Sequence, residues 1–277
     1  MRRLLSVLAL ASPLLAACPR SGSGPGAVDA TPPAPADAAV PASTADAAPQ
    51  PAEVPIPTKP AWTLDRRSYS PPDVPDALSL YGWSTEGAFA FEVGIEGRGT
   101  RCAGALRFRV VDARTDRFLG RVDVEHPDRE TDDCAASALE GQLAPQRRAL
   151  LAEHRIDARA FSAPVRPVKK ADGVFALALP GGDEARLRFQ TRHVVKDIYS
   201  EAAEAGAAYR LVLEREGHDP VVIEDGARRR PGVVDYKLEP GFAFFSPDGK
   251  SLALFVVRLE RAFEGARWSW MANGVTL

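Results

Sequence analysis

Three cysteines carry the clearest chemistry in this chain of 277 residues. Cys18 ends an apolar N-terminal segment, while Cys102 is expected at the start of a strand and Cys134 at the start of a helix. In an oxidising, exported compartment such an isolated pair is typical of one structural disulfide. A bridge closing a loop of about 32 residues would stabilise the fold by roughly 3–4 kcal/mol. Two separate buried thiols are the alternative, and a redox pair would more often be close in sequence.

The N-terminal segment has the pattern of a secretory signal. Arg2 and Arg3 precede an apolar run, Leu4 to Leu15, that is too short for a comfortable transmembrane helix. The run ends in Leu15-Ala16-Ala17-Cys18, which resembles the bacterial lipobox. This resemblance implies removal of residues 1–17 and acylation of Cys18, which would anchor the protein to an envelope membrane, inner or outer. An ordinary cleavage site beside an unrelated cysteine is the alternative.

The histidines and acidic residues of the chain do not form a pattern that is typical of catalysis or of metal binding. The histidines form no metal-binding motif, and the acidic cluster at residues 128–133 lacks the pattern of a calcium loop. That cluster fits the start of a helix better, since acidic groups favour the positive end of the helix dipole. We therefore predict no catalytic residue, no metal and no cofactor. The histidines are His126, His154, His193 and His218.

Two further groups of side chains could contact a partner. Trp268 and Trp270 are two residues apart, so they should lie on the same side of a strand. Burial in the core is the favoured interpretation, and an exposed aromatic platform for a protein or sugar is the alternative. Arg228, Arg229 and Arg230 are interpreted as a solvated loop, with contact to lipid headgroups or an anionic partner as the alternative.

Composition limits the remaining classes of function. The formal net charge is -2, which excludes nucleic-acid binding by bulk positive charge. Residues 18–60 comprise the candidate lipidated cysteine and a segment that is roughly half Ala and Pro, without aromatic residues before position 61. Such a segment buries too little apolar surface to fold, so we expect a disordered tether. Residues 61–277 are predicted to form a single globular, β-rich domain.

The elements of this domain are predicted mainly as strands. Alternation of Leu106, Phe108 and Val110 with Arg107 and Arg109 indicates a strand with one buried and one solvated face. Further strands are expected over residues 78–84, 88–95, 105–113, 118–125, 174–179, 185–190, 208–216 and 220–225, with three more towards the C-terminus. Between residues 130 and 154, Gly141 and Pro145 favour two helices over one. The expected fold is mainly β or α+β, with antiparallel meanders and a two-helix insertion.

Two predicted hairpins share a turn pattern. Residues 244–255 contain Ser-Pro-Asp-Gly before an apolar strand, and residues 82–91 repeat the aromatic-Ser-x-x-Gly order. Glycine suits the left-handed position of such a turn. The hairpins resemble those of TolB and WD40-like propeller blades, so a small complete β-propeller is the alternative fold. Only two copies are present, whereas a propeller requires at least four blades.

The same motifs resemble a bacterial family of predicted secreted proteins of unknown function (domain of unknown function 2259). The matching residues are Gly82–Glu92, Phe245–Gly249, Leu252–Val257 and Phe263-Glu264-Gly265. The resemblance implies a secreted location and brings no known activity. From the anchor and tether we therefore predict a non-enzymatic envelope lipoprotein that binds an envelope protein or polymer. An envelope hydrolase, with carboxylates gathered from distant positions, is the alternative.

Overall fold

The computed structural model describes residues 55–65, 76–95, 104–126, 136–193, 206–262 and 265–277. These residues belong to one compact unit, Ala52–Leu277. Cys18, Cys102 and Cys134 lie outside the described residues, as do the predicted signal sequence and most of the predicted tether. The anchor and the disulfide therefore stay predictions.

The described strands form three antiparallel sheets. The first sheet has the order β1-β2-β3-β4-β5, the second has β10-β9-β8-β7-β6 with β11 beside β9, and the third has β12-β13-β14. The first sheet comprises β1 (Trp62–Thr63), β2 (Ala77–Trp83), β3 (Ala88–Ile95), β4 (Ala105–Asp112) and β5 (Arg117–Glu125). The second comprises β6 (Val168–Ala171), β7 (Val174–Ala178), β8 (Glu184–His193), β9 (Gly206–Glu214), β10 (Val221–Asp225) and β11 (Arg230–Pro231). The third comprises β12 (Val233–Phe245), β13 (Ser251–Ala262) and β14 (Gly265–Thr276).

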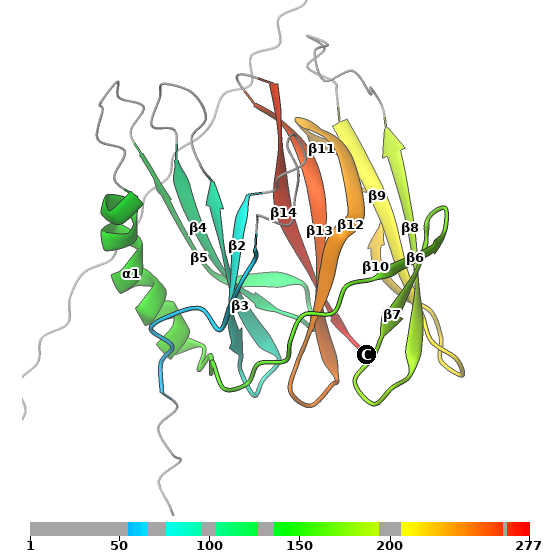
Figure 1. Ribbon diagram of the computed structural model, residues 1–277, viewed down its shortest axis with the longest axis horizontal. Helices are drawn as coiled ribbons and strands as arrows, with labels where there is room; N and C mark the ends of the chain where they lie inside the picture. Colours follow the sequence, from blue (N-terminus) through cyan, green and yellow to red (C-terminus); the bar gives the residue numbers. More distant parts are fainter. Residues whose placement is uncertain (1–54, 66–75, 96–103, 127–135, 194–205, 263–264) are drawn as a thin grey trace, which may run out of the picture. The chain divides into compact units, whose positions relative to one another are not determined.

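The third sheet lies between the other two, as Figure 1 shows. Its central strand β13 carries a continuous apolar run whose side chains alternate between two cores. Ala253, Phe255 and Val257 pack against the first sheet, and the residues between them pack against the second. A strand buried on both faces requires such an unbroken apolar run. This stack of layers differs from the radial blades of a propeller, so the propeller alternative is wrong for the described fold.

One helix, α1 (Ala136–Glu153), covers the outer face of the first sheet. It packs on β4 and β5 through Leu139, Leu143 and Leu151. The prediction of two helices was wrong because α1 continues through Pro145. Proline removes one helical hydrogen bond. Apolar contacts on both sides of this residue hold the two halves of α1 on the sheet, which offsets that loss.

A crossing segment, residues 154–167, joins α1 to the second sheet and is fixed to both of the other sheets. The Asp157 N–H donates to Trp83 O at 3.0 Å, and Val165 exchanges two backbone hydrogen bonds with Ala243. The crossing segment can approach β2 this closely because residue 82 is a glycine. A Cβ added to Gly82 would lie 2.2 Å from Asp157 O. A glycine is therefore required where the crossing segment meets β2.

The two predicted hairpins share a serine acceptor and a left-handed glycine in their turns, although the second turn is one residue longer. Ser84 Oγ accepts the Ala88 N–H at 3.0 Å, and Ser246 Oγ accepts the Ser251 N–H at 2.9 Å. Gly87 and Gly249 have φ of 85° and 69° respectively, as the sequence pattern predicts. The strands missed by the sequence analysis are β1, β6, β11 and the first half of β12.

Candidate functional site

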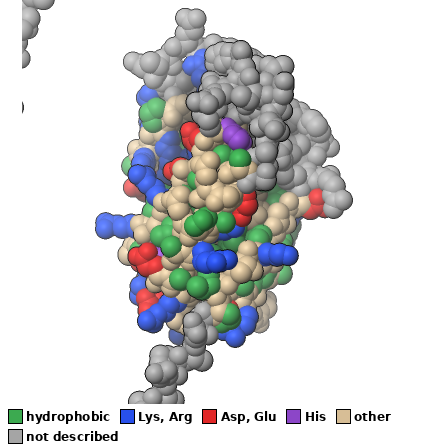
Figure 2. All heavy atoms as spheres, turned by 90° about the vertical axis from the view of Figure 1, so that its left-hand side faces the viewer, with side chains coloured by type: hydrophobic (Ala, Val, Ile, Leu, Met, Phe, Trp, Pro, Cys, Tyr) green, Lys and Arg blue, Asp and Glu red, His purple; other side chains and the backbone are tan. Residues whose placement is uncertain are grey.

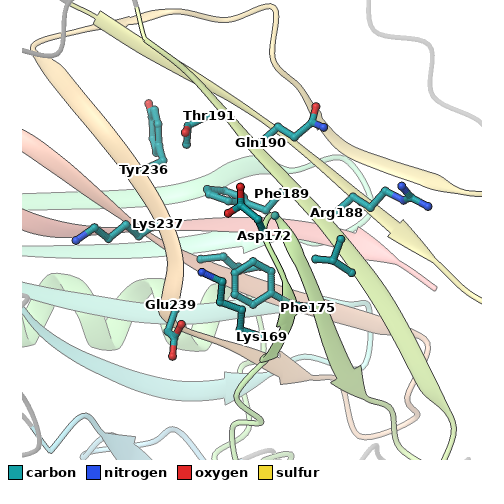
Figure 3. Close-up of a pocket in the computed structure, with 13 residues that line it drawn as sticks. Lys169, Asp172, Phe175, Arg188, Phe189, Gln190, Thr191, Tyr236, Lys237 and Glu239 are labelled. Atoms are coloured by element: carbon teal, nitrogen blue, oxygen red, sulfur yellow. The ribbon is translucent and has the colours of Figure 1, made fainter.

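A cleft of about 780 Å³ lies between β12 and the strands β6, β7 and β8 (Figure 3). Phe175 and Phe189 lie deep in it and are almost fully buried. Lys169 and Asp172 come from the β6–β7 hairpin, and Glu239 comes from β12 on the opposite wall. The cleft therefore combines an apolar floor with charges of both signs.

The β6–β7 hairpin holds Asp172 at the cleft by means of a tight two-residue turn. Asp172 and Gly173 occupy this turn, and Gly173 has φ of 66°. An Asp-Gly pair is the typical sequence for such a turn. The carbonyl of Gly173 accepts the Phe189 N–H at 2.8 Å, and an added Cβ would lie 2.7 Å from Phe189 O. The turn is thus fixed against β8.

The opposite wall is formed by Tyr236 to Glu239 of β12. The pairing of β12 with β13 shifts between Lys237 and Phe242, and this irregularity bends β12 where it passes the cleft. Within the part of the chain that the structure describes, β12 is paired with a strand on one side only, apart from the isolated pairing of Ala243 with Val165. An edge strand of this kind can accept a further strand through its backbone groups.

Charged side chains surround the cleft and are mostly exposed. Lys169, Asp172 and Glu239 are exposed, and Arg188 forms an ion pair with Glu214 at 2.7 Å. Because both cleft carboxylates are in contact with water, this cleft does not hold them in the buried state that would make one an acid and the other a base. Within the described part of the chain, no group of three or more His, Cys, Asp or Glu residues could hold a metal ion.

Trp268 and Trp270 are in the core, as the favoured interpretation predicts. Their exposed fractions are 8% and 3%. Trp270 Nε1 donates to Asp76 O at 2.8 Å, and its ring lies 5.3 Å from that of Phe242. Lys237 Nζ lies 4.2 Å from the centre of the Trp268 ring. These rings therefore form no exposed platform.

Arg230 departs from the predicted solvated loop. Its guanidinium pairs with Glu224 at 3.0 Å and lies 5.7 Å from the Tyr209 ring and 6.0 Å from the Tyr236 ring. The loop interpretation was wrong for Arg230 because β11 pairs with β9 and directs this side chain over two aromatic rings. Arg228 and Arg229 are exposed.

The cleft residues were not found from the sequence, although one signal was present. The pair Asp172-Gly173 between Ala171 and Val174 is a hairpin pattern that would have identified β6 and placed Asp172 at a turn. The part of the cleft that comes from β12 had no comparable signal in the sequence. Its proximity to β8 depends on how two sheets stack.

The described residues define a mainly β domain of three stacked antiparallel sheets with one helix. The chain belongs to the family described as Predicted secreted protein (DUF2259), whose profile matches residues 90–276. The matched range contains the whole cleft and most of all three sheets. No curated protein and no solved structure matched the chain. Among the described residues, no helix is long and apolar enough to cross a membrane.

Proposed function

We propose that this protein is a lipid-anchored envelope protein whose cleft binds an extended segment of another polypeptide. The observation that carries the proposal is the edge of β12, which borders the cleft and, among the described strands, has none paired to its outer side between Tyr236 and Glu239. A bound segment would pair with this edge, while pockets along the cleft would select its side chains.

Charge and burial favour a polypeptide ligand over a glycan. Sugar-binding sites use exposed aromatic faces, whereas Phe175 and Phe189 are buried and present little surface. The rim instead carries both cations and carboxylates, such as Lys169 and Asp172, which suit a peptide with charged side chains of both signs. The hydrolase alternative would need carboxylates held away from water, and both cleft carboxylates are exposed.

Site-specific photo-crosslinking in cells tests the cleft. A photoreactive residue at Thr191, which lines the cleft, should give a discrete adduct whose mass spectrum contains peptides of a second protein. The same residue at Val222, exposed on β10, is the matched position outside the cleft. Equal adducts from both positions, or none from Thr191, would contradict the proposal.

A charge-reversed pair sharpens this experiment. Asp172→Lys should weaken the Thr191 adduct because it changes the charge at the cleft turn. Asp183→Lys makes the same change on the exposed β7–β8 turn and should leave the adduct intact.

The anchor is tested separately. Cys18→Ala should move the protein from the membrane fraction to the soluble periplasmic fraction, because acyl chains contribute about 0.8 kcal/mol per buried CH₂ to membrane binding. Intact mass of the wild-type protein should show loss of residues 1–17 and added acyl mass. A mature protein without acyl mass would refute the anchor and leave the cleft proposal standing.

A further inference from the structure

A second cavity of about 170 Å³ opens between the first sheet and strand β14, separate from the cleft. Cross-strand pairing aligns Phe91 with Arg109 and Arg109 with Arg121 on one face of the first sheet. That face is apolar on β3, where the third sheet covers it, and becomes charged on β4 and β5. The polar face of β4 therefore borders a groove beside β14, while α1 covers the opposite face of the sheet.

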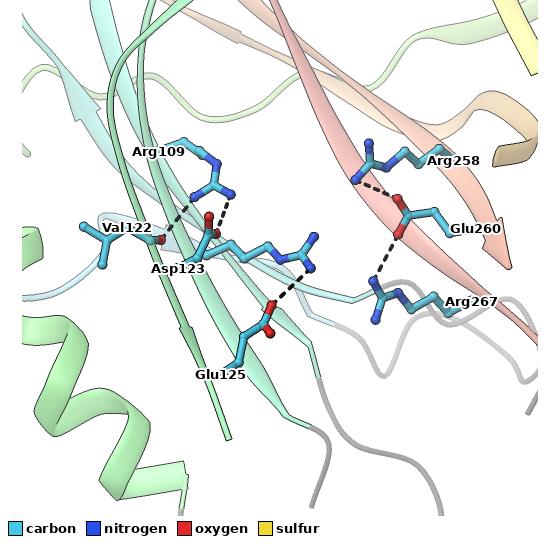
Figure 4. A network of polar contacts seen from close by, with 8 residues as sticks. Arg109, Val122, Asp123, Glu125, Arg258, Glu260 and Arg267 are labelled. Carbon is cyan, nitrogen blue, oxygen red and sulfur yellow. Dashed lines mark hydrogen bonds and ion pairs between the residues drawn. The ribbon is translucent and has the colours of Figure 1, made fainter. Parts of the chain in front are cut away.

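This arginine groove has an excess of positive charge. Among the described residues that line it, four are arginines and none is a carboxylate. Figure 4 shows arginines from β4 facing those of β13 and β14, with carboxylates paired beside them. This group contains five arginines and three carboxylates that form ion pairs with them. Two of its positive charges are therefore not balanced by a carboxylate of the group. The arginines are Arg107, Arg109, Arg121, Arg258 and Arg267, and the carboxylates are Asp123, Glu125 and Glu260.

Arg258 occupies this groove at an electrostatic cost. Its side chain is 22% exposed, it pairs with Glu260 at 2.8 Å, and its Nε is buried without a hydrogen-bond partner in the described structure. Burial lowers the pKa of Arg258, and the neighbouring positive charge of Arg107 opposes the stabilising effect of Glu260. A guanidinium in this situation is stabilised by an anion that accepts hydrogen bonds from it.

Arg121 supplies the groove with a cation that has no ion-pair partner among the described residues. Beside it, Phe118 is 63% exposed, with the Arg109 guanidinium 5.8 Å from its ring centre. The volume is below the roughly 300–1,000 Å³ of sites for drug-sized ligands, so it suits one compact charged group. The exposed Phe118 ring adjoins that group on the solvent side.

We propose that the arginine groove binds a phosphate group, presented either by a small phosphate ester or by the headgroup of an anionic phospholipid. Planar guanidinium groups match the oxygens of phosphate through paired hydrogen bonds, and a ligand of this charge balances the two surplus cations. The inference is independent of the ligand in the cleft.

Calorimetric titration of the full chain in neutral detergent tests the inference, with inorganic phosphate and phosphatidylglycerol mixed micelles as separate probes. We expect one binding site per chain, and an affinity about tenfold weaker in Arg121→Gln, since a charge-assisted hydrogen bond is lost. Arg258→Lys keeps the positive charge but loses the planar guanidinium group, so it should also weaken binding. Arg148→Gln removes one exposed charge from α1, the side seen in Figure 2, where basic and acidic side chains are interspersed; it should bind as the wild type does.

The outcomes separate the two sources of phosphate. Binding of inorganic phosphate that depends on Arg121 supports a free phosphate ester, and Arg121-dependent binding of the micelles alone supports a lipid headgroup. Failure of both probes overturns the inference. Equal weakening in Arg121→Gln and Arg148→Gln also overturns it, because that result reports bulk charge.

Discussion

Replacing Gly82 by alanine should destabilise this protein severely. Gly82 has φ of 143°, a backbone conformation that an alanine adopts only with strain. An added Cβ would lie 2.2 Å from Asp157 O and 2.9 Å from the carbonyl carbon of the same residue. Since ordinary contacts are above 3 Å, the crossing segment would have to move away from β2 by roughly 1 Å.

The expected cost follows from three contributions. The strained φ contributes about 1–2 kcal/mol. Loss of the hydrogen bond from the Asp157 N–H to Trp83 O contributes about 1 kcal/mol. Looser packing around the fully buried Trp83 ring adds roughly 1–2 kcal/mol. Alanine also restricts the unfolded chain, which stabilises the variant by up to about 1 kcal/mol. In total, the free energy of unfolding should fall by about 3 kcal/mol.

Gly94→Ala is the matched control, because it makes the same change in the neighbouring strand. There an added Cβ would contact Ala77 Cβ at 3.4 Å and Leu106 Cδ2 at 3.5 Å, which are ordinary distances. Urea unfolding followed by tryptophan fluorescence should show Gly94→Ala within about 1 kcal/mol of the wild type. A cost below about 1 kcal/mol for Gly82→Ala, or equal costs for both variants, would refute the proposed role of this close contact.

Three other variants test polar contacts between elements. Although Asp116 is exposed overall, loss of water around its carboxylate raises its pKa to about 6, against a hydrogen bond from the Gly274 N–H that lowers it. The stability from this group is thus fully present below pH 3.8 and lost as pH rises through 6. Asp116→Asn should abolish that decline and, allowing for solvent exposure, stabilise the protein at pH 7.5 by about 1 kcal/mol, measured by urea unfolding across this pH range. Arg147→Met leaves the largely buried Glu92 carboxylate without its cation and also removes the ion pair with Glu140, which is 47% exposed. It should cost about 3 kcal/mol, seen as a lower midpoint of thermal unfolding followed by circular dichroism. Asn273→Ala removes the acceptor 2.6 Å from the Tyr209 hydroxyl and should lower the free energy of unfolding in urea by about 2 kcal/mol. The same substitution should cost less in a Tyr209→Phe variant, which has already lost this hydrogen bond.

Local sequence patterns predicted most of the strands. The alternation in residues 105–110 and the turn glycines Gly87 and Gly249 depend on neighbouring residues only, so the hairpins could be placed from the sequence. α1 was predicted as two helices because Pro145 weakens a helix locally. Its continuity depends on contacts with β4 and β5, which a local pattern does not contain.

The sites were harder to predict than the strands. The cleft depends on β12 lying beside β8, and the arginine groove depends on the third sheet having fewer strands than the first. The arginines of β4 were correctly assigned to a polar face. What the sequence did not show is that β13 and β14 border this face and leave Arg109 only partly exposed, because that depends on how two sheets stack.

The central position of β13 has a consequence for the order of folding. Its apolar run completes both major cores, yet β12, β13 and β14 are the last described strands to be synthesised. A nascent or translocating chain that lacks them exposes two unpaired apolar sheet faces, which are prone to aggregate. Both outer sheets therefore have an apolar face that stays uncovered until the C-terminal strands emerge.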